Sequence, residues 1–289
     1  MQYNSSMKFL IVILILLSVD SFAADCSPAK DTSRITVAGG SITEILYALG
    51  AENQIIAVDT TSNFPVQTKN HPSIGYVRNL SAEGVLSLNP TLIIGEDDMG
   101  PPAVLEQIGA TGVDIEVVEE QHSSQGVIDK INCVASILSK GDIANRYIQE
   151  ELLPTIKQLE QRIKKPRLAE KALFILSLQS GSPLVAGTET SAHGLIKMIG
   201  VTNSMSSFRG WKPASTEAII AAAPDVILIS QRGVSSFGGL DAVKKHPALR
   251  LTPAVQKNRV IAMDGMAMLG FGPRTVDSAL SLAEMIFTD

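Results

Sequence analysis

The sequence predicts an α/β fold built from two similar units, and three features indicate it. Short apolar runs such as RITVAGG (34–40) alternate with amphipathic stretches such as SITEILYALGA (41–51), which is the pattern of strands and helices in βαβ units. The same alternation resumes after about residue 167. SAEGVLSLNPTLII (81–94) also aligns without gaps with STEAIIAAAPDVIL (215–228), at a constant offset of 134 residues. A repeat of this kind indicates internal duplication of an α/β unit, although short apolar helices also match by chance.

The first half is expected to be a parallel sheet with helical crossovers. Ser41, followed by Glu44, forms a capping-box pattern that predicts the start of the first helix, and Ser81 is the expected cap of the second. Pro90 closes that second helix. Strands are expected at 34–40, 55–61, 91–97 and 113–119, and helices at 41–51, 80–90 and 102–112.

The second half repeats this alternation, and its strands are also expected to be parallel. VAGGSITEILYALG (37–50) matches VAGTETSAHGLIKMIG (185–200) with two additional residues, which supports the duplication. Strands are expected at 171–178, 183–187, 225–230 and 259–265, and helices at 191–200, 215–224, 239–249 and 274–287.

A helical segment separates the halves. Apolar residues recur at helical spacing through residues 142–165, and Pro154 is expected to kink or restart the helix. The expected domains are an N-terminal lobe at 24–141, a connecting helix at 142–166 and a C-terminal lobe at 167–289. One stiff helix between two α/β lobes predicts small hinge motion, and a ligand cleft where the carboxyl ends of their strands face each other.

The N-terminus indicates export. Lys8 precedes an apolar run from Phe9 to Val19, and Ser21-Phe22-Ala23 resembles a cleavage site, so residues 1–23 are predicted to be a signal peptide. The apolar run is too short for a membrane anchor.

The mature chain has two cysteines, Cys26 and Cys133. Asp25 stands where a lipoprotein site requires a small residue, so lipidation of Cys26 is the less favoured interpretation. Export permits a disulfide, but 107 residues of separation do not establish one.

Composition and motifs argue against two classes of protein, nucleic-acid-binding proteins and enzymes. A formal net charge of −5 gives no indication of nucleic-acid binding. The chain contains no GxGxxG, GxxxxGK[ST] or GxSxG motif, so an exported α/β enzyme is only a remote alternative.

Three segments carry a family resemblance. VAGGSITEILYALGAENQIIAVDTTSNFP, GYVRNLSAEGVLSLNPTLII and GWKPASTEAIIAAAPDVILI resemble the periplasmic binding proteins of ABC importers for haem, cobalamin and siderophores. Within that group the chain most resembles the haem-binding proteins. The resemblance implies a class III binding protein, with two Rossmann-like lobes joined by a single long α-helix. It also implies a monomer in the periplasm that passes haem to the permease of an ABC importer in the inner membrane. Cobalamin and iron–siderophore cargoes remain alternatives.

Tyr76 and Arg78 are the central candidates for cargo binding. Iron(III) favours a phenolate oxygen, tyrosine is an established type of axial haem ligand, and a nearby cation stabilises the phenolate. In an extended chain, residues two apart share a face, so Arg78 could donate to the phenol oxygen. The resemblance implies that Tyr76 binds the haem iron and that Arg78 supports it. The alternative is that Tyr76 packs in a turn and Arg78 is solvated.

Four further residues complete the candidate haem pocket. His193 is a candidate second ligand, with His71 a weaker one, although a lone histidine is more often a capping or surface group. Arg232 follows a predicted strand and could pair with a propionate, or be a solvated loop charge. Met99 is expected at the rim of the cleft, where it would contact the porphyrin, with packing of the loop as the alternative.

Glu83 and Glu217 occupy matching positions in the two repeats. An acidic residue near a helix N-terminus is favourable in itself. The resemblance implies that these two glutamates dock onto arginines of the permease, one from each lobe.

Overall fold

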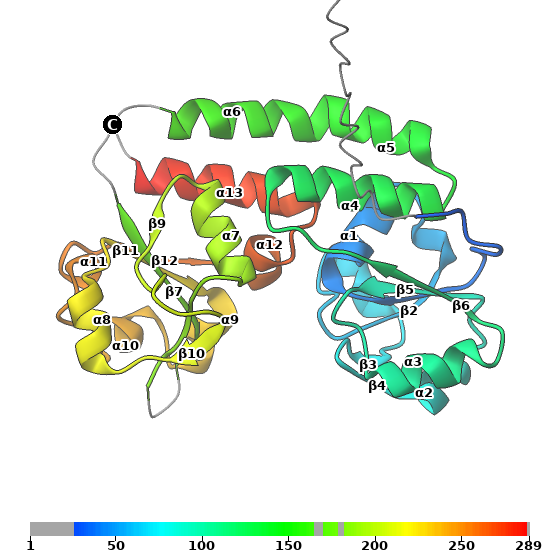
Figure 1. The fold of residues 1–289 in the computed structure, drawn as a ribbon, viewed down its shortest axis with the longest axis horizontal. Coiled ribbons are helices and arrows are strands. Elements are labelled where there is room, and N and C mark those ends of the chain that lie inside the picture. The colour runs from blue at the N-terminus through cyan, green and yellow to red at the C-terminus, as the bar shows by residue number, and fades with distance from the viewer. Residues whose placement is uncertain (1–25, 165–169, 179–181, 288–289) are drawn as a thin grey trace, which may run out of the picture.

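The two larger β-sheets of the described chain stand side by side beneath a layer of long helices (Figure 1). The computed structural model describes residues 26–164, 170–178 and 182–287, so the predicted signal peptide (1–23) lies outside the described residues. We call the first sheet with its helices the N-terminal lobe, and the second sheet with its helices the C-terminal lobe.

The N-terminal lobe contains a parallel sheet in the order β2-β1-β5-β6, as the pattern of its sequence predicts. Its elements are β1 (Ile35–Ala38), α1 (Gly40–Ala48), β2 (Ile55–Val58), α2 (Ala82–Leu86), β5 (Leu92–Glu96), α3 (Pro102–Gly109), β6 (Asp114–Val118) and α4 (Ser124–Ile137), with short helices at Glu52–Gln54 and Val66–Asn70. The long helix α4 was not predicted.

The predicted capping box at Ser41 is wrong. Helix α1 begins at Gly40, with Gly39 as the cap residue and no side-chain cap. Ser41 lies inside the helix and donates to Glu96, while Glu44 is buried and pairs with Arg274. Both polar side chains therefore serve long-range contacts, which a local sequence pattern does not reveal. Ser81 does cap α2, as predicted, by accepting from the Gly84 N–H.

The C-terminal lobe contains a mixed sheet in the order β10-β8-β7-β11-β12, with β9 paired to β7. Its strands are β7 (Lys171–Ser177), β8 (Leu184–Ala186), β9 (Thr202–Asn203), β10 (Trp211–Pro213), β11 (Val226–Ser230) and β12 (Val260–Met263). Its helices are α7 (Ser191–Met198), α8 (Thr216–Ala222), α9 (Gln231–Ser236), α10 (Leu240–Lys245), α11 (Pro253–Gln256), α12 (Gly265–Leu269) and α13 (Pro273–Ile286).

The prediction that all strands of this half are parallel is wrong. Strand β8 runs antiparallel to β7 and to β10. The chain between β7 and β8 is too short for the helical crossover that a parallel pair requires.

The repeat seen in the sequence corresponds only in part to a repeat of the structure. Strands β5 and β11 lie at the predicted offset of 134 residues, and helices α2 and α8 precede them. The second matched pair of segments does not correspond, because β1 lies between two parallel neighbours and β8 between two antiparallel ones.

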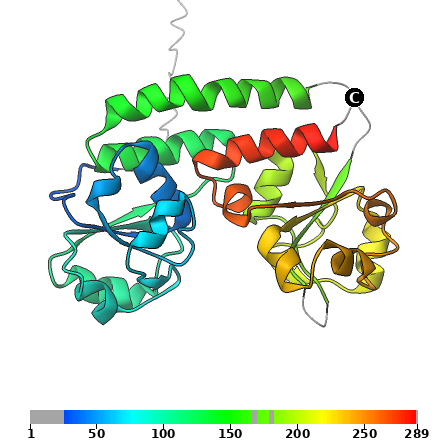
Figure 2. The same ribbon diagram turned by 180° about the vertical axis from the view of Figure 1, so that it is seen from behind.

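The predicted connecting helix crosses above both lobes (Figures 1 and 2). It consists of α5 (Gly141–Tyr147), a π-helical turn (Ile148–Leu152) and α6 (Leu153–Ile163). Pro154 stands in the first turn of α6, directly after the π-helical turn, and the backbone stays in the right-handed helical region at Tyr147, Leu152 and Leu153, so the segment continues as a helix rather than restarting at Pro154.

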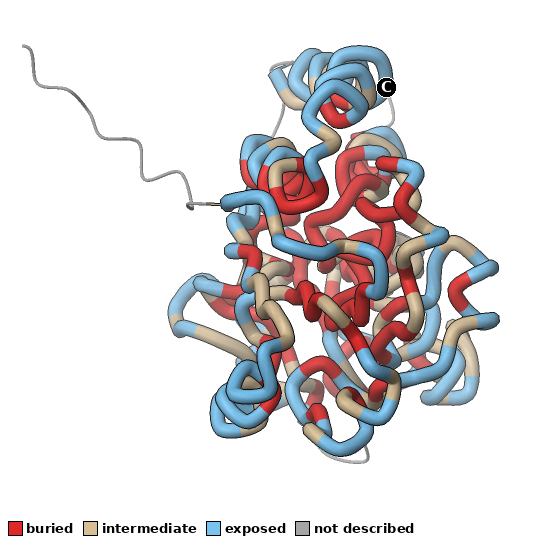
Figure 3. Tube along the Cα trace, turned by 90° about the vertical axis from the view of Figure 1, so that its right-hand side faces the viewer, coloured by how far each residue is buried: buried red, intermediate tan, exposed pale blue. Residues whose placement is uncertain are grey.

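One apolar cluster extends through both lobes. It joins Ile42 and Leu46 of α1 to Val134 of α4, and continues to Phe174 of β7 and Leu282 of α13. Figure 3 shows this buried interior beneath the exposed outer helix. A shared apolar core opposes free movement of one lobe against the other.

A disulfide between Cys26 and Cys133 ties the start of the described chain to α4, with 5.2 Å between the Cα atoms. Within the described ranges, no helix combines the length and the hydropathy that a bilayer-spanning helix requires.

Candidate functional site

Tyr76 lies on a small hairpin that was not predicted. Strand β3 (Gly75–Tyr76) pairs antiparallel with β4 (Asn79–Leu80), and Tyr76 is opposite Asn79. Gly75 has a φ of 89°, which an L side chain rarely adopts. In Figure 1 the hairpin lies on the side of the N-terminal lobe that faces the C-terminal lobe.

Buried side chains and backbone hydrogen bonds anchor the hairpin to the rest of the lobe, so that the Tyr76 side chain is held outward. Val77 and Leu80 are buried in the apolar cluster of the lobe. Gly100 donates its N–H to the Val77 carbonyl at 3.0 Å, and its own carbonyl accepts from the Leu80 N–H at 2.8 Å. The Tyr76 side chain remains available, with 44% of the residue exposed.

Arg78 lies beside Tyr76 but bonds to Asp98, a residue that was not predicted. Its Nε and a terminal nitrogen both donate to Asp98 Oδ2, at 2.6 and 2.5 Å. The guanidinium carbon is 5.9 Å from the centroid of the Tyr76 ring. Burial lowers the pKa of Arg78, but the hydrogen bond and charge of Asp98 outweigh it and raise the pKa, so the cation is maintained.

Asp98 has an unused oxygen. Its Oδ1 is buried and has no hydrogen-bond partner among the residues that the structure describes. A buried acceptor of this kind favours the arrival of a donor. Asp98 belongs to the acidic run Glu96-Asp97-Asp98 at the carboxyl end of β5, where ligands of parallel sheets bind.

Glu96 begins this run and points toward α1. Ser41 donates to its Oε1 at 2.6 Å. Burial raises the pKa of Glu96 to about 7, against the opposing effects of Lys130 and Ser41. A carboxyl group with such a pKa changes its charge near neutral pH, and nothing in the local sequence signalled it.

His193 lies in the first turn of α7, which Thr190 caps by accepting from the His193 N–H at 3.1 Å. Its Nδ1 is 3.3 Å from the Asn203 amide nitrogen, which also donates to the carbonyl of Ala186. Nδ1 therefore accepts, and the ring carries its proton on Nε2. Ligation through Nε2 needs the opposite tautomer, and Nδ1 is engaged with Asn203, so the present hydrogen bond does not prepare His193 for ligation.

The two remaining predicted pocket residues, Arg232 and Met99, differ in exposure. Arg232 is exposed in the first turn of α9, directly after β11. Met99 is only 5% exposed and packs in the apolar cluster of the N-terminal lobe. The prediction that Met99 lies at the rim is wrong, because its thioether fills the space above Gly95, which agrees with the alternative of loop packing.

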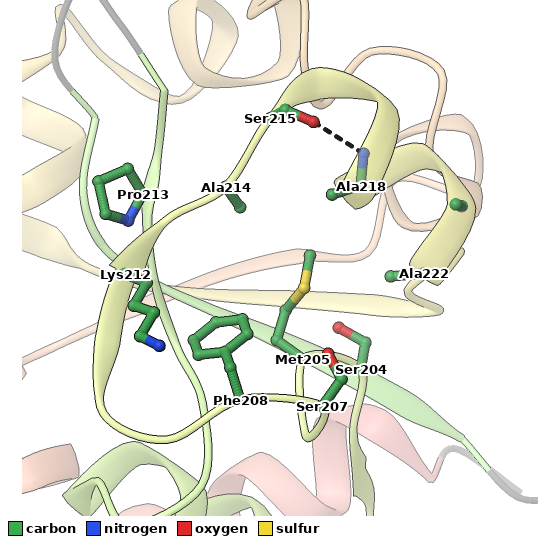
Figure 4. Close-up of a pocket in the computed structure, with 11 residues that line it drawn as sticks. Ser204, Met205, Ser207, Phe208, Lys212, Pro213, Ala214, Ser215, Ala218 and Ala222 are labelled. Atoms are coloured by element: carbon green, nitrogen blue, oxygen red, sulfur yellow. Dashed lines mark hydrogen bonds between the residues drawn. The ribbon is translucent and has the colours of Figure 1, made fainter.

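Glu83 and Glu217 are exposed in the first turns of α2 and α8. Figure 4 shows a pocket of about 460 Å³ beside α8, lined by Met205, Phe208 and the alanines of that helix. This pocket contains none of the residues around Tyr76.

The described part of the chain has no cluster of three or more His, Cys, Asp or Glu side chains that could bind a bare metal ion. The arrangement around Tyr76 instead offers one phenol oxygen, one fixed cation and an acidic run. The phenol oxygen suits a ligand that brings its own partly coordinated metal, and the guanidinium beside it stabilises a phenolate.

Comparisons with solved structures reveal extensive similarity. The periplasmic haem-binding protein RhuT from Roseiflexus sp. RS-1, in its apo form, is 36% identical with a TM-score of 0.83, over 89% of this chain and 98% of that chain. The periplasmic haem-binding protein BhuT in complex with two haems is 35% identical with a TM-score of 0.82, over 88% of this chain and 97% of that chain.

A family model and curated proteins also match most of the chain. The model of the periplasmic binding protein family matches residues 35–267. An uncharacterised ABC transporter substrate-binding lipoprotein, YvrC of Bacillus subtilis, is 26% identical over 93% of this chain and 85% of its own length. The vitamin B12-binding protein of Yersinia pestis is 26% identical over 70% of this chain and 71% of its own length.

Proposed function

The chain belongs to the periplasmic binding protein family, and we propose that it captures haem and delivers it to the permease of an ABC importer. The solved relatives at 35% and 36% identity are named as haem-binding proteins, and their similarity extends over nearly the whole described chain. In this proposal the protein is a class III binding protein, and haem enters between its two lobes. It acts as a binding protein and not as an enzyme.

The observation that carries the proposal is the exposed Tyr76 on a rigid hairpin, with the cation of Arg78 5.9 Å from its ring. A phenol is neutral at pH 7, and iron(III) coordination removes its proton. The nearby guanidinium stabilises the resulting phenolate. Tyr76 is thus the proposed axial ligand of the haem iron, and Arg78 its supporting cation.

The negative propionates of haem require cations or donors at the edge of the site. Arg232 lies after β11 and is exposed, so it is available for this role. His193 contributes a ring at the wall of the site, and iron ligation by it would require a change of tautomer.

Docking to the permease is assigned to Glu83 and Glu217. Each is an exposed acid in the first turn of a short helix, and there is one in each lobe. A monomer with one acid per lobe matches a permease of two similar subunits.

We further propose that the mature protein is soluble in the periplasm after cleavage of residues 1–23. Cys26 is engaged in a disulfide with Cys133, so its sulfur is not available for a lipid anchor, in contrast to the lipoprotein relative from Bacillus subtilis. The disulfide also suits an oxidising compartment.

A titration tests the cargo. Purified mature protein is mixed with haemin, and separately with cobalamin, and the visible spectrum and binding isotherm are recorded. Haemin is expected to bind with a high-spin tyrosinate-type spectrum, and cobalamin weakly. Cobalamin remains the second candidate, because a vitamin B12-binding protein is among the relatives. Tight binding of cobalamin without binding of haemin would replace the proposal with this alternative.

A further inference from the structure

Lys130 is a buried cation that joins the two lobes. It lies on α4, and its side chain is fully enclosed. Its ammonium donates to Ser41 Oγ at 3.0 Å, to the Gly270 carbonyl at 3.0 Å and to the carboxylate of Glu120. An ammonium has three hydrogens, so all three find acceptors, as a buried charge requires.

The acceptors belong to both lobes. Ser41 and Glu120 are in the N-terminal lobe, whereas Gly270 lies between α12 and α13 in the C-terminal lobe. Gly272, two residues on, approaches Ser41 so closely that a Cβ on Gly272 would lie 2.9 Å from the Ser41 Cβ. The ring of Phe271 is 4.9 Å from that of His122, which also bonds to Glu120. The lobes are therefore in direct, tightly packed contact around the ammonium.

On the N-terminal side, the link continues toward Tyr76. Ser41 accepts from Lys130 and donates to Glu96 at the end of β5. Asp98, two residues beyond Glu96, holds Arg78 beside the Tyr76 ring. Hydrogen bonds thus connect Gly270, at the contact between the lobes, through Lys130 and Ser41 to Glu96 at the end of β5. The chain that follows β5 carries Asp98 and so positions the candidate haem site.

A second cation also crosses between the lobes, but it is less enclosed. Arg274 of α13 pairs with Glu44 of α1 at 2.5 Å and lies over the Phe64 ring, 4.1 Å from its centroid. Its side chain is 23% exposed, so water screens it in part. Lys130 has no such screening and is the stronger determinant of the contact.

We infer that Lys130 is a positioning residue for ligand retention, an inference that rests on the proposed haem-binding function. It fixes the Gly270–Gly272 segment of the C-terminal lobe against the end of β5, and so sets the distance between Tyr76 and the opposite wall of the site. Loss of the link lets the lobes separate more often and lets haem leave faster.

The test uses Lys130→Met combined with Glu120→Gln, which removes the cation together with the charge of the carboxylate that bonds to it. Spin labels on cysteines introduced at the exposed positions Glu106 and Lys245, one in each lobe, report the distance between lobes with the native disulfide intact. Haem dissociation is followed by transfer to an excess of a scavenging haem protein. We expect a wider distance distribution in the ligand-free variant and a dissociation rate about tenfold higher, which corresponds to the loss of one charge-assisted network bond.

The matched control is Arg259→Met with Glu170→Gln. Arg259 also bonds a carboxylate, at 2.6 Å, and a carbonyl, that of Ile286 at 2.7 Å, but all three residues lie in the C-terminal lobe. This control is expected to lower stability without changing either readout. Ser41→Ala is a milder second variant, should the Lys130 variant not fold, and its effects are expected to be smaller and in the same direction.

A distance distribution equal to that of the control would overturn the inference, whether or not haem binds. A wider distribution with an unchanged dissociation rate would also overturn it, because the link would then have no role in retention. If the wild-type chain does not bind haemin, the proposed function fails, and the distances still decide whether Lys130 holds the lobes together.

Discussion

The guanidinium of Arg78 lies 5.9 Å from the centroid of the Tyr76 ring while its nitrogens donate to Asp98. Asp98 thereby fixes the cation next to the phenol before any ligand arrives. A site whose charges are already oriented loses less conformational entropy on binding than one built from free side chains. The Tyr76–Arg78–Asp98 set is therefore expected to act as a unit, and substitutions of Tyr76 and of Asp98 test it separately.

Substitution of Tyr76 by Phe is expected to abolish the tyrosinate-type spectrum of the haem complex. Phenylalanine keeps the ring over which Arg78 lies but has no oxygen to bind iron. Haem affinity is expected to fall at least tenfold, as measured by titration with haemin and by absorbance in the visible region. Because Tyr76 is 44% exposed, the stability of the fold should change little.

Tyr47→Phe is the control for this experiment. Tyr47 belongs to the same lobe but lies on α1 and not on the hairpin. Its hydroxyl is hydrogen-bonded to His71 Nε2 at 3.2 Å. Its removal should leave the spectrum unchanged. If both variants retain the wild-type spectrum, Tyr76 is not the iron ligand.

Asp98→Asn is expected to weaken haem binding about threefold to tenfold without removing the spectrum. The amide neutralises the partner of Arg78, which lets the guanidinium leave the phenol. The pair is partly exposed, so the free energy of unfolding should fall by only about 0.2–1 kcal/mol. Titration with haemin and urea denaturation measure the two effects. Asp97→Asn, at the exposed neighbouring position, is the control, and an equal loss of affinity there would argue against a specific role for Asp98.

Local patterns in the sequence predicted most strands and helices, because alternation of apolar runs and capping residues such as Ser81 act over a few positions. They did not predict the roles of Ser41 and Glu44. Both were interpreted as a helix cap, yet they bond to Glu96 and to Arg274, which are 55 and 230 residues away. The partners were not visible until the fold brought them together.

The candidate site shows the same limit. Tyr76 and Arg78 stood out by their types and spacing, but Asp98 and Lys130 did not. Asp98 belongs to an acidic run that resembles a solvated loop, and Lys130 lies in a helix that the sequence did not predict. The sequence identifies side chains of unusual chemistry. The residues that orient these side chains are identified only from the contacts between residues in the folded structure.

Charge reversal at both proposed docking positions, Glu83→Lys with Glu217→Lys, is expected to abolish haem uptake by the importer but leave haem affinity unchanged. Both side chains are exposed and neither belongs to the Tyr76–Arg78–Asp98 set, although each charge reversal removes a favourable interaction of an acid with its helix N-terminus. Uptake into vesicles or cells and titration with haemin are measured in parallel. The control pair is Glu106→Lys with Asp241→Lys, also one exposed acid per lobe. Uptake that survives the first pair would exclude the docking assignment.

Removal of the disulfide by Cys26→Ser with Cys133→Ser is expected to lower the free energy of unfolding by about 2–4 kcal/mol, because the bond closes a long loop in the unfolded chain. Urea denaturation of the oxidised wild type and the variant measures the difference. Mass spectrometry of the exported wild-type protein supplies the second readout. A mass that includes a lipid on Cys26 would contradict both the disulfide and the proposed soluble form.

Glu96→Gln is expected to make stability less dependent on pH near neutrality. Burial raises the pKa of Glu96 from 4.5 to about 7, so between these values the folded protein retains a proton that the unfolded chain has released. The stability due to this proton is fully present below about pH 4.5 and is lost as the pH rises through 7. Glutamine cannot ionise, and its oxygen can still accept from Ser41. The wild type should therefore lose on the order of 1–3 kcal/mol more than the variant between pH 5 and pH 8, since one pKa unit corresponds to about 1.4 kcal/mol.

Urea denaturation of both proteins at several pH values measures this difference directly. Contributions from titrating groups that do not interact with Glu96 are shared by the two proteins and cancel in the comparison, whereas those of Glu120, Lys130 and Asp98 are coupled to Glu96 and form part of its effect. Glu106→Gln removes a carboxyl from the surface of α3 and serves as the control. The expected order at pH 8 is that Glu96→Gln is the most stable of the three, because the wild type and the control must both hold an ionised carboxylate near Glu120. Parallel curves for Glu96→Gln and the wild type would mean that Glu96 ionises in the folded protein as readily as in the unfolded chain.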